Sequence, residues 1–364
     1  MGGILNGEDP ASILIVKLSA IGDVVHALAF LQVLRGRFPR ARIDWLVEEA
    51  AQPLIEGHPA IDKVLLCRRK SWERTLKHRP GSLGPLREVW VFLRELRSFE
   101  YDLVVDLQGL LKSGVLVGLS RGKRKIGMTG SREGAGLFLN ERAIPVNYEE
   151  HAVDRYLRVA EYLGCRTDLW DGRIPFTEAE RRSVDMMLAR AGVGEEPLVA
   201  INPVARWQTK LWDPERFADL AGRMRKELGC RVVFTGGATD RPVIHDICRM
   251  MEGFPLNLAG RTTLKELACL YTRCRLLITT DTGPMHMAAA MGRPVVALFG
   301  PTAPWRTGPY GKGHRVIRSG VECSPCFKKR CSHMTCMKEI GVGDVFNGIR
   351  EIVEETTKSE RSEE

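Results

Sequence analysis

Residues 276–302, LLITTDTGPMHMAAAMGRPVVALFGPT, bring polar side chains to the end of a predicted strand. The pattern predicts a strand over Leu276–Thr280, a tight turn, a short helix over Pro284–Met291 and a strand over Val295–Leu298. Asp281 and Thr282 come where the first strand ends, and Gly283 permits a sharp turn or a close backbone approach. The free N–H groups at the start of this helix would bind an anion, most commonly phosphate. The alternative is an ordinary βαβ unit with a polar corner.

A second strand-to-helix turn, KLSAIGD at residues 17–23, ends in the carboxylate of Asp23. The turn holds one glycine and matches neither G-x-G-x-x-G nor G-K-[ST], so it supports neither a dinucleotide site nor a Walker loop. Asp23 could cap the helix that it begins, because aspartate is favoured at that position. Alternatively, it could act as a general base toward a hydroxyl group bound at this edge.

The loop NPVARWQTKLW, residues 202–212, follows a predicted strand over Leu198–Asn202 and contains a cation, Lys210. Ligands of parallel α/β sheets bind at the carboxyl ends of the strands. Lys210 could therefore neutralise phosphate charge, and the alternative is a solvated loop lysine.

The elements that must position these residues alternate between strand and helix. In the first half, strands are predicted over Ile13–Lys17, Ile43–Val47, Lys63–Leu66, Leu103–Asp106 and Lys125–Met128, and helices over Asp23–Arg37, Leu86–Arg97, Leu110–Leu119 and His151–Leu163. In the second half, helices are predicted over Thr177–Ala191, Pro214–Leu228 and Thr263–Leu270, with a further strand over Arg231–Thr235. Nearly continuous apolar strands are typical of parallel sheets buried on both faces. Each half is therefore predicted to be a doubly wound α/β domain.

The length of 364 residues suits two domains. Residues 166–177 hold Gly172 and Pro175 and show no periodicity, so we place the interdomain linker there. The predicted domains are residues 1–170 and 171–364, facing a cleft, and we leave open whether the last helix packs back onto the N-terminal domain.

The net charge of +9 suits an acidic partner, such as nucleic acid, an anionic membrane surface or a phosphorylated substrate. A basic surface without any partner is the alternative. The N-terminal MGGILNGEDP carries two acids and lacks a long apolar core, so we expect no secretory signal. Because charges also interrupt the apolar windows, we expect no transmembrane helix and a cytoplasmic protein.

Basic side chains gather in two clusters. The first is a predicted loop with Arg68, Arg69, Lys70, Arg74, Lys77 and Arg79, and the second holds Arg121, Lys123, Arg124, Lys125 and Arg132. A solvated loop and a nucleic-acid patch are both compatible with these charges alone.

Four of the ten cysteines, Cys323, Cys326, Cys331 and Cys336, lie at short spacing. In a cytosolic protein such cysteines are metal ligands or free thiols rather than disulfides. The spacing fits no standard zinc finger, so reduced thiols in a loop are favoured over a structural metal cluster or a redox pair.

Three spaced motifs together resemble the ADP-heptose lipopolysaccharide heptosyltransferases over nearly the whole chain. They are K-x-S-x-x-G-D at residues 17–23, KLWDPERF at residues 210–217, and D-T-G-x-x-H-x-A-A-A from Asp281 with the following F-G-P-T. The segments DWLVEE, RRK and DLQGL, starting at residues 44, 68 and 106, look most like the heptosyltransferase I branch, which adds the first heptose to the Kdo residues on lipid A.

The resemblance implies a GT-B fold with the acceptor on the N-terminal domain and the donor on the C-terminal domain. It assigns Asp23 as the base and Lys210 as the lysine near the donor pyrophosphate. It places donor contacts at Thr262, Glu266, Asp281, Thr282, Gly283 and His286. The spacing Thr263-x-x-Glu266 by itself also predicts a helix capping box.

The implied reaction moves heptose from ADP-L-glycero-D-manno-heptose to Kdo–lipid A with inversion and without a cofactor. The absence of a D-x-D sequence agrees with a metal-independent route. The resemblance favours Arg68, Arg69, Lys70 and Arg132 as acceptor contacts and an anionic inner membrane, rather than nucleic acid, as the docking surface. The enzyme would then be peripheral on the cytoplasmic face of that membrane.

Three alternatives stay open. A related heptosyltransferase could act on a later inner-core heptose. A nucleotide-sugar epimerase could share the architecture, and a non-catalytic nucleic-acid or membrane binder could use the basic clusters.

Overall fold

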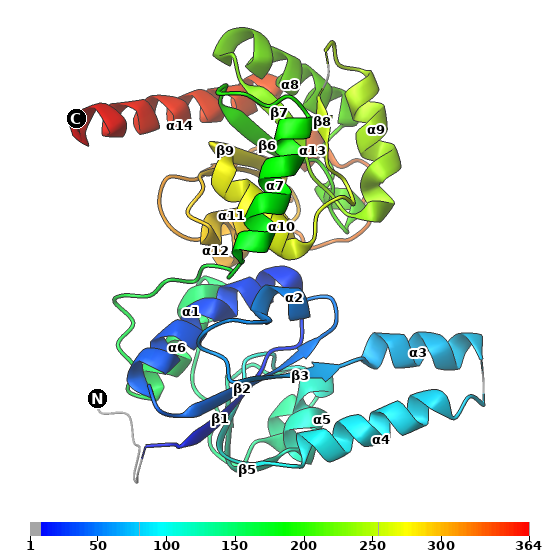
Figure 1. Ribbon diagram of the computed structural model, residues 1–364, viewed down its shortest axis with the longest axis vertical. Helices are drawn as coiled ribbons and strands as arrows, with labels where there is room; N and C mark the ends of the chain where they lie inside the picture. Colours follow the sequence, from blue (N-terminus) through cyan, green and yellow to red (C-terminus); the bar gives the residue numbers. More distant parts are fainter. Residues whose placement is uncertain (1–8, 80, 254, 364) are drawn as a thin grey trace. The chain divides into compact units, whose positions relative to one another are not determined.

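The computed structural model describes residues 9–363 apart from Pro80 and Phe254 (Figure 1). Residues 1–8, where no secretory signal is expected, lie outside the described part. The chain divides into two compact units, Met1–Pro175 and Phe176–Glu364, and the division falls within the segment that the sequence marks as a linker.

The first unit is built on a five-stranded parallel sheet in the order β3-β2-β1-β4-β5. Its strands are β1 (Ser12–Val16), β2 (Arg42–Glu48), β3 (Lys63–Cys67), β4 (Glu100–Asp106) and β5 (Arg121–Gly127). Its helices are α1 (Ile21–Arg37), α2 (Gln52–Ile55), α3 (Arg69–His78), α4 (Gly84–Leu96), α5 (Leu111–Leu119), the 3₁₀ turn η1 (Ala135–Phe138) and α6 (Ala152–Tyr162). The strand order reverses between β1 and β4, which is where such sheets bind ligands.

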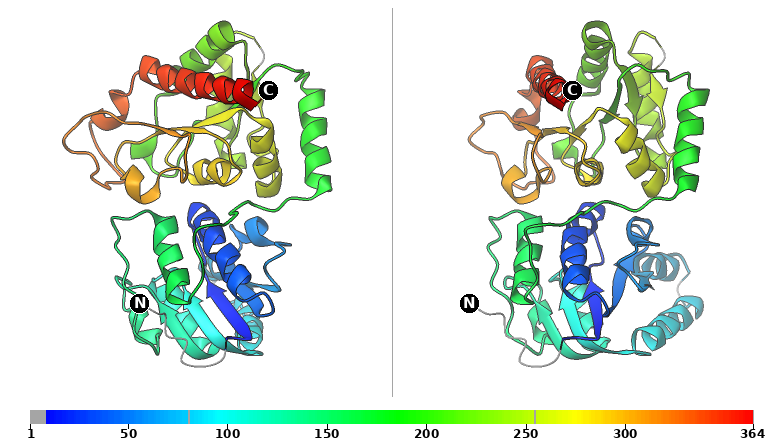
Figure 2. Two further views of the ribbon diagram at one scale, coloured as in Figure 1. Left: turned by 90° about the vertical axis from the view of Figure 1, so that its left-hand side faces the viewer. Right: turned by 60° about the vertical axis from the view of Figure 1, so that its left-hand side comes forward.

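Helices cover both faces of this sheet (Figure 2). Alternate side chains of β1, Leu14 and Val16, pack with Phe92 and Leu96 of α4 in one apolar cluster. The inner strands β1 and β2 are buried on both faces, which explains their largely apolar sequence, whereas the edge strand β5 is basic and partly exposed.

The second unit holds a six-stranded parallel sheet in the order β11-β10-β9-β6-β7-β8. Its strands are β6 (Leu198–Asn202), β7 (Arg231–Phe234), β8 (Leu256–Asn257), β9 (Leu276–Thr280), β10 (Val295–Leu298) and β11 (Arg315–Ile317). Its helices are α7 (Glu178–Arg190), η2 (Gln208–Lys210), α8 (Pro214–Leu228), η3 (Ala238–Asp240), α9 (Arg241–Arg249), α10 (Leu264–Arg273), α11 (Gly283–Ala290), α12 (Pro304–Thr307), α13 (Thr335–Lys338) and α14 (Val342–Glu363). The order reverses between β6 and β9, and the last helix, α14, packs on α8, β10 and β11 of this unit.

The segment that the sequence predicted as a basic loop is mostly the helix α3, so that prediction was wrong. Trp72 holds the helix against α4, because its ring lies 5.5 Å from that of Phe92 and its Nε1 donates to Glu88 at 2.8 Å. One buried aromatic residue among charged residues gives no helical periodicity in the sequence.

Among the described helices, none combines the length and the apolar character needed to cross a bilayer.

Candidate functional site

An ion pair joins two loops at the carboxyl edge of the second sheet. Lys210, at the end of η2, places its Nζ 2.6 Å from Oδ2 of Asp281, which directly follows β9. The lysine also donates to the backbone oxygen of Asp281 at 3.3 Å. Only 15% of the Lys210 side chain and 8% of the Asp281 side chain are exposed. The predicted phosphate-neutralising lysine is therefore preorganised by a carboxylate 71 residues away.

Thr302 completes this cluster from a third loop. Its hydroxyl donates to Oδ2 of Asp281 at 2.6 Å, and Thr302 lies just beyond β10. Because β10, β9 and β6 are neighbours in the sheet, the segments that follow them meet at one edge. The ring of Trp207 lies 4.6 Å from Lys210 Nζ and adds a cation–π contact.

The helix α11 begins at this cluster, as the sequence predicted for the turn after Asp281. Thr282 is extended, with φ −152° and ψ 168°, and makes no side-chain cap. Gly283 occupies the first helical position, where the backbone N–H lacks an intrahelical partner. His286 is buried within the same helix. The positive end of α11 and the Lys210 ammonium thus lie next to each other, an arrangement suited to a phosphate.

Two buried polar atoms at the same edge have no hydrogen-bond partner within the described chain: the Thr280 hydroxyl and Oδ1 of Asn202. Asn202 ends β6 and donates from Nδ2 to the backbone oxygen of Thr235. Buried polar groups are nearly always paired, so unpaired ones at a ligand-binding edge indicate groups that a ligand or water would satisfy. Sequence reasoning named neither, although both stand at predicted strand ends.

Both carboxylate oxygens of Glu266 accept hydrogen bonds from nearby residues. Its Oε2 accepts the Thr263 N–H at 2.7 Å, and the Thr263 hydroxyl accepts the Glu266 N–H at 3.2 Å, which confirms the predicted capping box. Its Oε1 accepts a hydrogen bond from Ser183 at 2.6 Å. Thr262 lies just before this cap and is half-buried. The donor contacts expected at both residues stay predictions.

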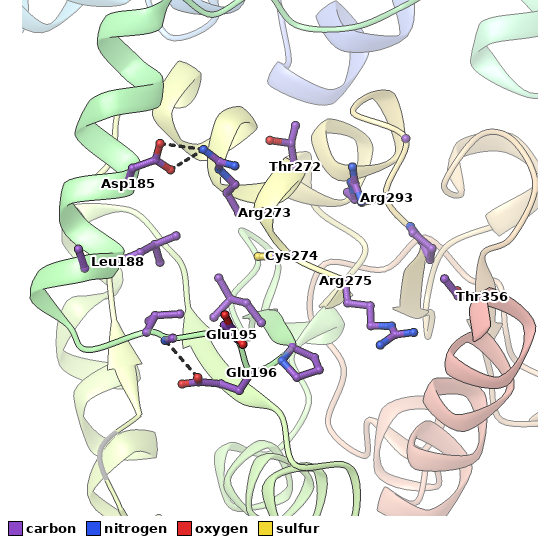
Figure 3. Close-up of a pocket in the computed structure, with 17 residues that line it drawn as sticks. Asp185, Leu188, Glu195, Glu196, Thr272, Arg273, Cys274, Arg275, Arg293 and Thr356 are labelled. Atoms are coloured by element: carbon purple, nitrogen blue, oxygen red, sulfur yellow. Dashed lines mark hydrogen bonds and ion pairs between the residues drawn. The ribbon is translucent and has the colours of Figure 1, made fainter. Parts of the chain in front are cut away.

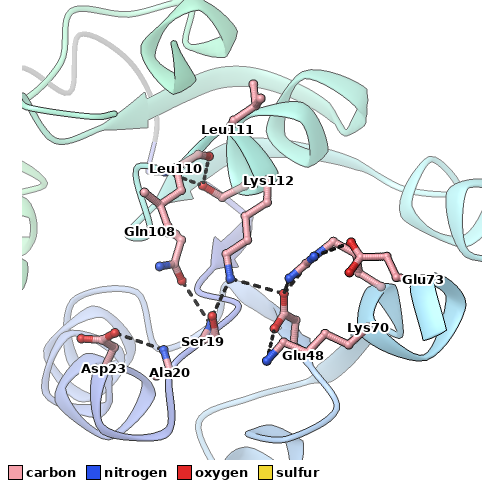
Figure 4. Close-up of polar contacts among 12 residues, drawn as sticks. Ser19, Ala20, Asp23, Glu48, Lys70, Glu73, Gln108, Leu110, Leu111 and Lys112 are labelled. Carbon is pink, nitrogen blue, oxygen red and sulfur yellow. Dashed lines mark hydrogen bonds and ion pairs between the residues drawn. The ribbon is translucent and has the colours of Figure 1, made fainter. Parts of the chain in front are cut away.

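In the first unit, Asp23 lies in the opening turn of α1 and not at its first residue, because the helix begins at Ile21. The carboxylate accepts the backbone N–H of Ala20 at 3.0 Å, so Asp23 does contribute to the cap (Figure 4). The adjoining Ser19 is held by two groups that follow β4. Gln108 Oε1 accepts its N–H at 3.1 Å, and Lys112 Nζ donates to its hydroxyl at 2.5 Å.

Glu48, at the end of β2, collects three cations (Figure 4). Its Oε1 lies 3.0 Å from Arg69 and 3.3 Å from Lys112, and its Oε2 lies 3.6 Å from Lys70. Burial alone would raise the pKa of Glu48, but the hydrogen bond from Arg69 and the charge of Lys112 lower it below its usual value. The carboxylate is therefore ionised at neutral pH and holds the start of α3 against the sheet.

The predicted acceptor-binding cations are not equivalent. Arg69 is committed to Glu48 and also to Glu73 of its own helix. Arg68 and Lys70 keep more than half of their side chains exposed, and Arg132 is exposed beyond β5. Arg69 is thus held by two carboxylates. Arg68, at 4.0 Å from Glu49, and Lys70, at 3.6 Å from Glu48, are also paired but remain reachable from solvent, as does Arg132.

A buried lysine and a buried aspartate brace the same edge. Lys17 follows β1 and donates to the backbone oxygen of Leu107 at 3.1 Å. Burial alone would lower the pKa of Lys17, but Tyr156 and Asp23 raise it above its usual value. Asp106 accepts the N–H of Gln108 and of the next residue, and burial raises the pKa of its carboxyl group.

A cavity of 820 Å³ lies at the other edge of the second sheet, beside the amino ends of β6, β9 and β10 (Figure 3). Its arginines are Arg273, Arg275 and Arg293, and Arg273 is paired with Asp185 at 2.6 Å. The polar strand-end residues described above lie at the opposite edge of the sheet, so this cavity is separate from the candidate site.

All ten cysteines are free thiols. Burial raises the pKa of Cys336, and its neighbours Cys323, Cys326 and Cys331 raise it further. The backbone N–H groups of Met334 and His333 lower the pKa of Cys331. Within the described residues, no group of three or more histidine, cysteine or acidic side chains is arranged to hold a metal ion. Cys323, Cys326, Cys331 and Cys336 are thus free thiols that lie near one another.

The two parallel-sheet units and the comparisons below define a glycosyltransferase of the GT-B type. A family model for glycosyltransferase family 9 (heptosyltransferase) matches residues 89–337, and the chain belongs to this family.

Lipopolysaccharide heptosyltransferase 1 of Pseudomonas aeruginosa is 31% identical over 330 residues, which cover 88% of this chain and 87% of the relative. Lipooligosaccharide heptosyltransferase 2 of Haemophilus influenzae is 30% identical over 320 residues, covering 84% and 88%. The structure of the E. coli heptosyltransferase WaaC with ADP matches with a TM-score of 0.74 and 27% identity, over 94% of this chain and 99% of that one. The expected family and the GT-B fold are thereby confirmed.

The buried ion pair predicts strong coupling between Lys210 and Asp281. We expect Lys210→Met and Asp281→Asn each to destabilise the fold, because each leaves the partner charge or its hydrogen bonds unsatisfied. The double variant should lose less stability than the two single losses combined, with a coupling of about 0.5–3 kcal/mol in denaturant unfolding.

The matched control is the exposed pair Arg223–Glu227 on α8, which lies at 2.6 Å with side chains 36% and 45% exposed. An exposed i,i+4 pair contributes about 0.3–0.5 kcal/mol. Equal coupling in the two pairs would show that Lys210 and Asp281 do not form a buried unit.

Proposed function

We propose that this protein transfers a heptose from ADP-L-glycero-D-manno-heptose to the Kdo–lipid A inner core, with inversion and without a metal. The observation that carries the proposal is the Lys210–Asp281 pair beside the start of α11. The E. coli heptosyltransferase WaaC, 27% identical in one comparison and 26% in the other, is described with ADP and with ADP-2-deoxy-2-fluoro heptose. That likeness supports a nucleotide-heptose donor, and the Lys210–Asp281 pair supports its binding at this edge of the second unit.

Charge development explains why this edge suits the donor. As the bond from heptose to ADP breaks, negative charge grows on the departing diphosphate. Lys210 and the N–H of Gly283 would stabilise that charge from fixed positions. Asp281 would keep the ammonium in place between turnovers, and the unpaired Thr280 and Asn202 groups would accept or donate to the bound nucleotide or its waters.

The first unit would supply the base and the acceptor contacts. Asp23 is half-buried at the sheet edge near Ser19, and its carboxylate accepts one hydrogen bond, from the Ala20 N–H. The other lone pairs could take the proton of an attacking hydroxyl. A base that activates a nucleophile on the face opposite the leaving group inverts the anomeric carbon. Arg68, Lys70 and Arg132 would contact the carboxylates and phosphates of the acceptor.

A heptosyltransferase acting on a later inner-core heptose is the second candidate. It is favoured by the match to a heptosyltransferase 2 at 30% identity, which nearly equals the 31% identity to a heptosyltransferase 1. In either case the acceptor is anchored in a membrane, and we propose a peripheral enzyme on the cytoplasmic face of the inner membrane.

A transfer assay tests the proposal. We expect ADP release when the protein is given ADP-heptose and Kdo–lipid A, with less release on an acceptor that already carries the first heptose. Faster transfer to the heptosylated acceptor would select the second candidate. Adding EDTA should leave the transfer rate unchanged. A transfer rate that EDTA abolishes and added Mg²⁺ restores would contradict the metal-free route.

Asp23→Asn separates the proposed base from the helix cap. The amide oxygen can still accept the Ala20 N–H, so thermal stability and ADP affinity should stay close to wild type. Loss of a general base should lower turnover by about 10²–10⁴-fold. If turnover is nearly normal while the melting temperature is unchanged, Asp23 acts only in the cap.

Substituting the more exposed cations Arg68 and Lys70 should affect acceptor binding, whereas substituting Arg69, which pairs with the buried Glu48, should affect stability. Arg68→Ala combined with Lys70→Ala should raise the acceptor KM and leave the ADP-heptose KM unchanged, because more than half of each side chain is exposed and can reach a polyanion. The defect should shrink at high salt. Arg69→Ala should instead destabilise the protein, since it leaves the buried Glu48 with less compensation. A raised donor KM in the double variant would refute the assignment of the first unit to the acceptor.

A further inference from the structure

The helix α4 exposes large apolar side chains to solvent. The exposed fractions are 76% for Leu83, 57% for Leu86, 60% for Trp90 and 52% for Val91. Leu83, Leu86 and Trp90 are spaced at i, i+3 and i+7, so they form one stripe along the helix. A contiguous apolar stripe on a water-soluble surface marks an interaction site more often than isolated exposed residues do.

The opposite side of α4 packs on its own unit. Phe92 and Leu96 are buried in the apolar cluster beneath the sheet, and Pro85 is buried at the start of the helix. The helix is therefore apolar on two sides, and only one of them is needed for folding. No part of the described chain covers the stripe of Leu83, Leu86 and Trp90, since all three keep more than half of their surface exposed.

Positive charge flanks the stripe. Between residues 68 and 97, nine lysines and arginines stand against three glutamates. Arg87 and Arg94 lie on α4 itself, and the guanidinium of Arg94 lies 5.5 Å from the centre of the Trp90 ring. An indole beside arginines is suited to a membrane interface, where the ring meets the acyl boundary and the cations meet headgroup phosphates.

A second helix of the same unit, α5, also exposes apolar side chains. On α5, Leu111, Val115 and Leu119 are spaced at i, i+4 and i+8 and are 44%, 37% and 36% exposed. Arg97, at the end of α4, donates to the backbone oxygen of Leu119 at 3.0 Å and ties the two helix ends together. The helices α3 and α4 project side by side from the same unit (Figure 1).

We infer that the exposed stripe of α4 docks the protein on an anionic lipid bilayer. Trp90 and Leu86 would enter the headgroup–acyl boundary, while Arg87 and Arg94 would pair with lipid phosphates. A protein partner would need an acidic apolar groove, whereas a bilayer meets both the apolar stripe and the surrounding charge without further assumptions. The inference rests on the proposed function only for the expectation that the acceptor lies in a membrane.

Vesicle partitioning tests this inference without any transfer reaction. The full-length protein is mixed with phosphatidylcholine vesicles that contain or lack phosphatidylglycerol, and the bound fraction is measured by sedimentation. We expect tighter binding to the anionic vesicles, and binding about tenfold or more weaker for Leu86→Gln combined with Trp90→Gln. The control is Leu169→Gln, which alters an 81% exposed leucine of the same unit outside α4 and α5 and should bind like wild type.

Transfer to a soluble, deacylated acceptor separates the inference from the proposed function. We expect the α4 variant to match wild type in that assay, because the stripe would bind lipid and not the sugar. Normal vesicle binding without any transfer would reject the proposed function and keep the inference. Equal vesicle binding by wild type and the α4 variant, or capture of a protein or nucleic acid by the stripe in place of lipid, would overturn the inference.

Discussion

The Lys210–Asp281 ion pair is the interaction on which the candidate donor site depends. It draws together the segments that follow β6 and β9, and Thr302 adds the segment after β10. A buried charge is costly unless it is paired and hydrogen-bonded, so each partner holds the other in place. The result is a cation fixed beside the positive end of α11. A diphosphate bound there would compete with Asp281 for Lys210 and could accept a hydrogen bond from the unpaired Thr280 hydroxyl, while Oδ1 of Asn202 would need a donor such as a hydroxyl group or a water.

The first unit also contains a buried charge that holds loops together, but here a carboxylate is surrounded by cations. Glu48 is a buried carboxylate that gathers Arg69, Lys70 and Lys112 at the carboxyl edge of the sheet. This pairing divides a strongly basic segment into cations that build the fold and cations that stay exposed. The exposed cations and the apolar stripe of α4 belong to the same part of the unit. Acceptor binding and membrane docking would thus draw on neighbouring surfaces.

Local patterns predicted all five strands of the first sheet and four of the six strands of the second, mostly as short apolar runs between turns. The strands β8 and β11 were missed because they span only two and three residues, and β5 begins earlier than predicted because its sequence is largely basic. Local patterns also predicted the turn at Asp281 and the capping box at Glu266, since both depend on residues close in sequence. They failed for α3, where Trp72 makes the decisive contacts with Phe92 and Glu88 in another helix. Pairs such as Lys210 with Asp281 join distant residues, so no local pattern reveals them.

The central claim, that Lys210 and the start of α11 hold the donor diphosphate, is tested most directly by a structure of the protein with ADP bound. We expect the diphosphate oxygens to lie within hydrogen-bond distance of Lys210 Nζ and the Gly283 N–H. A diphosphate held elsewhere, for example among Arg273, Arg275 and Arg293 in the cavity at the opposite edge of the sheet, with the Lys210–Asp281 pair untouched, would contradict this claim.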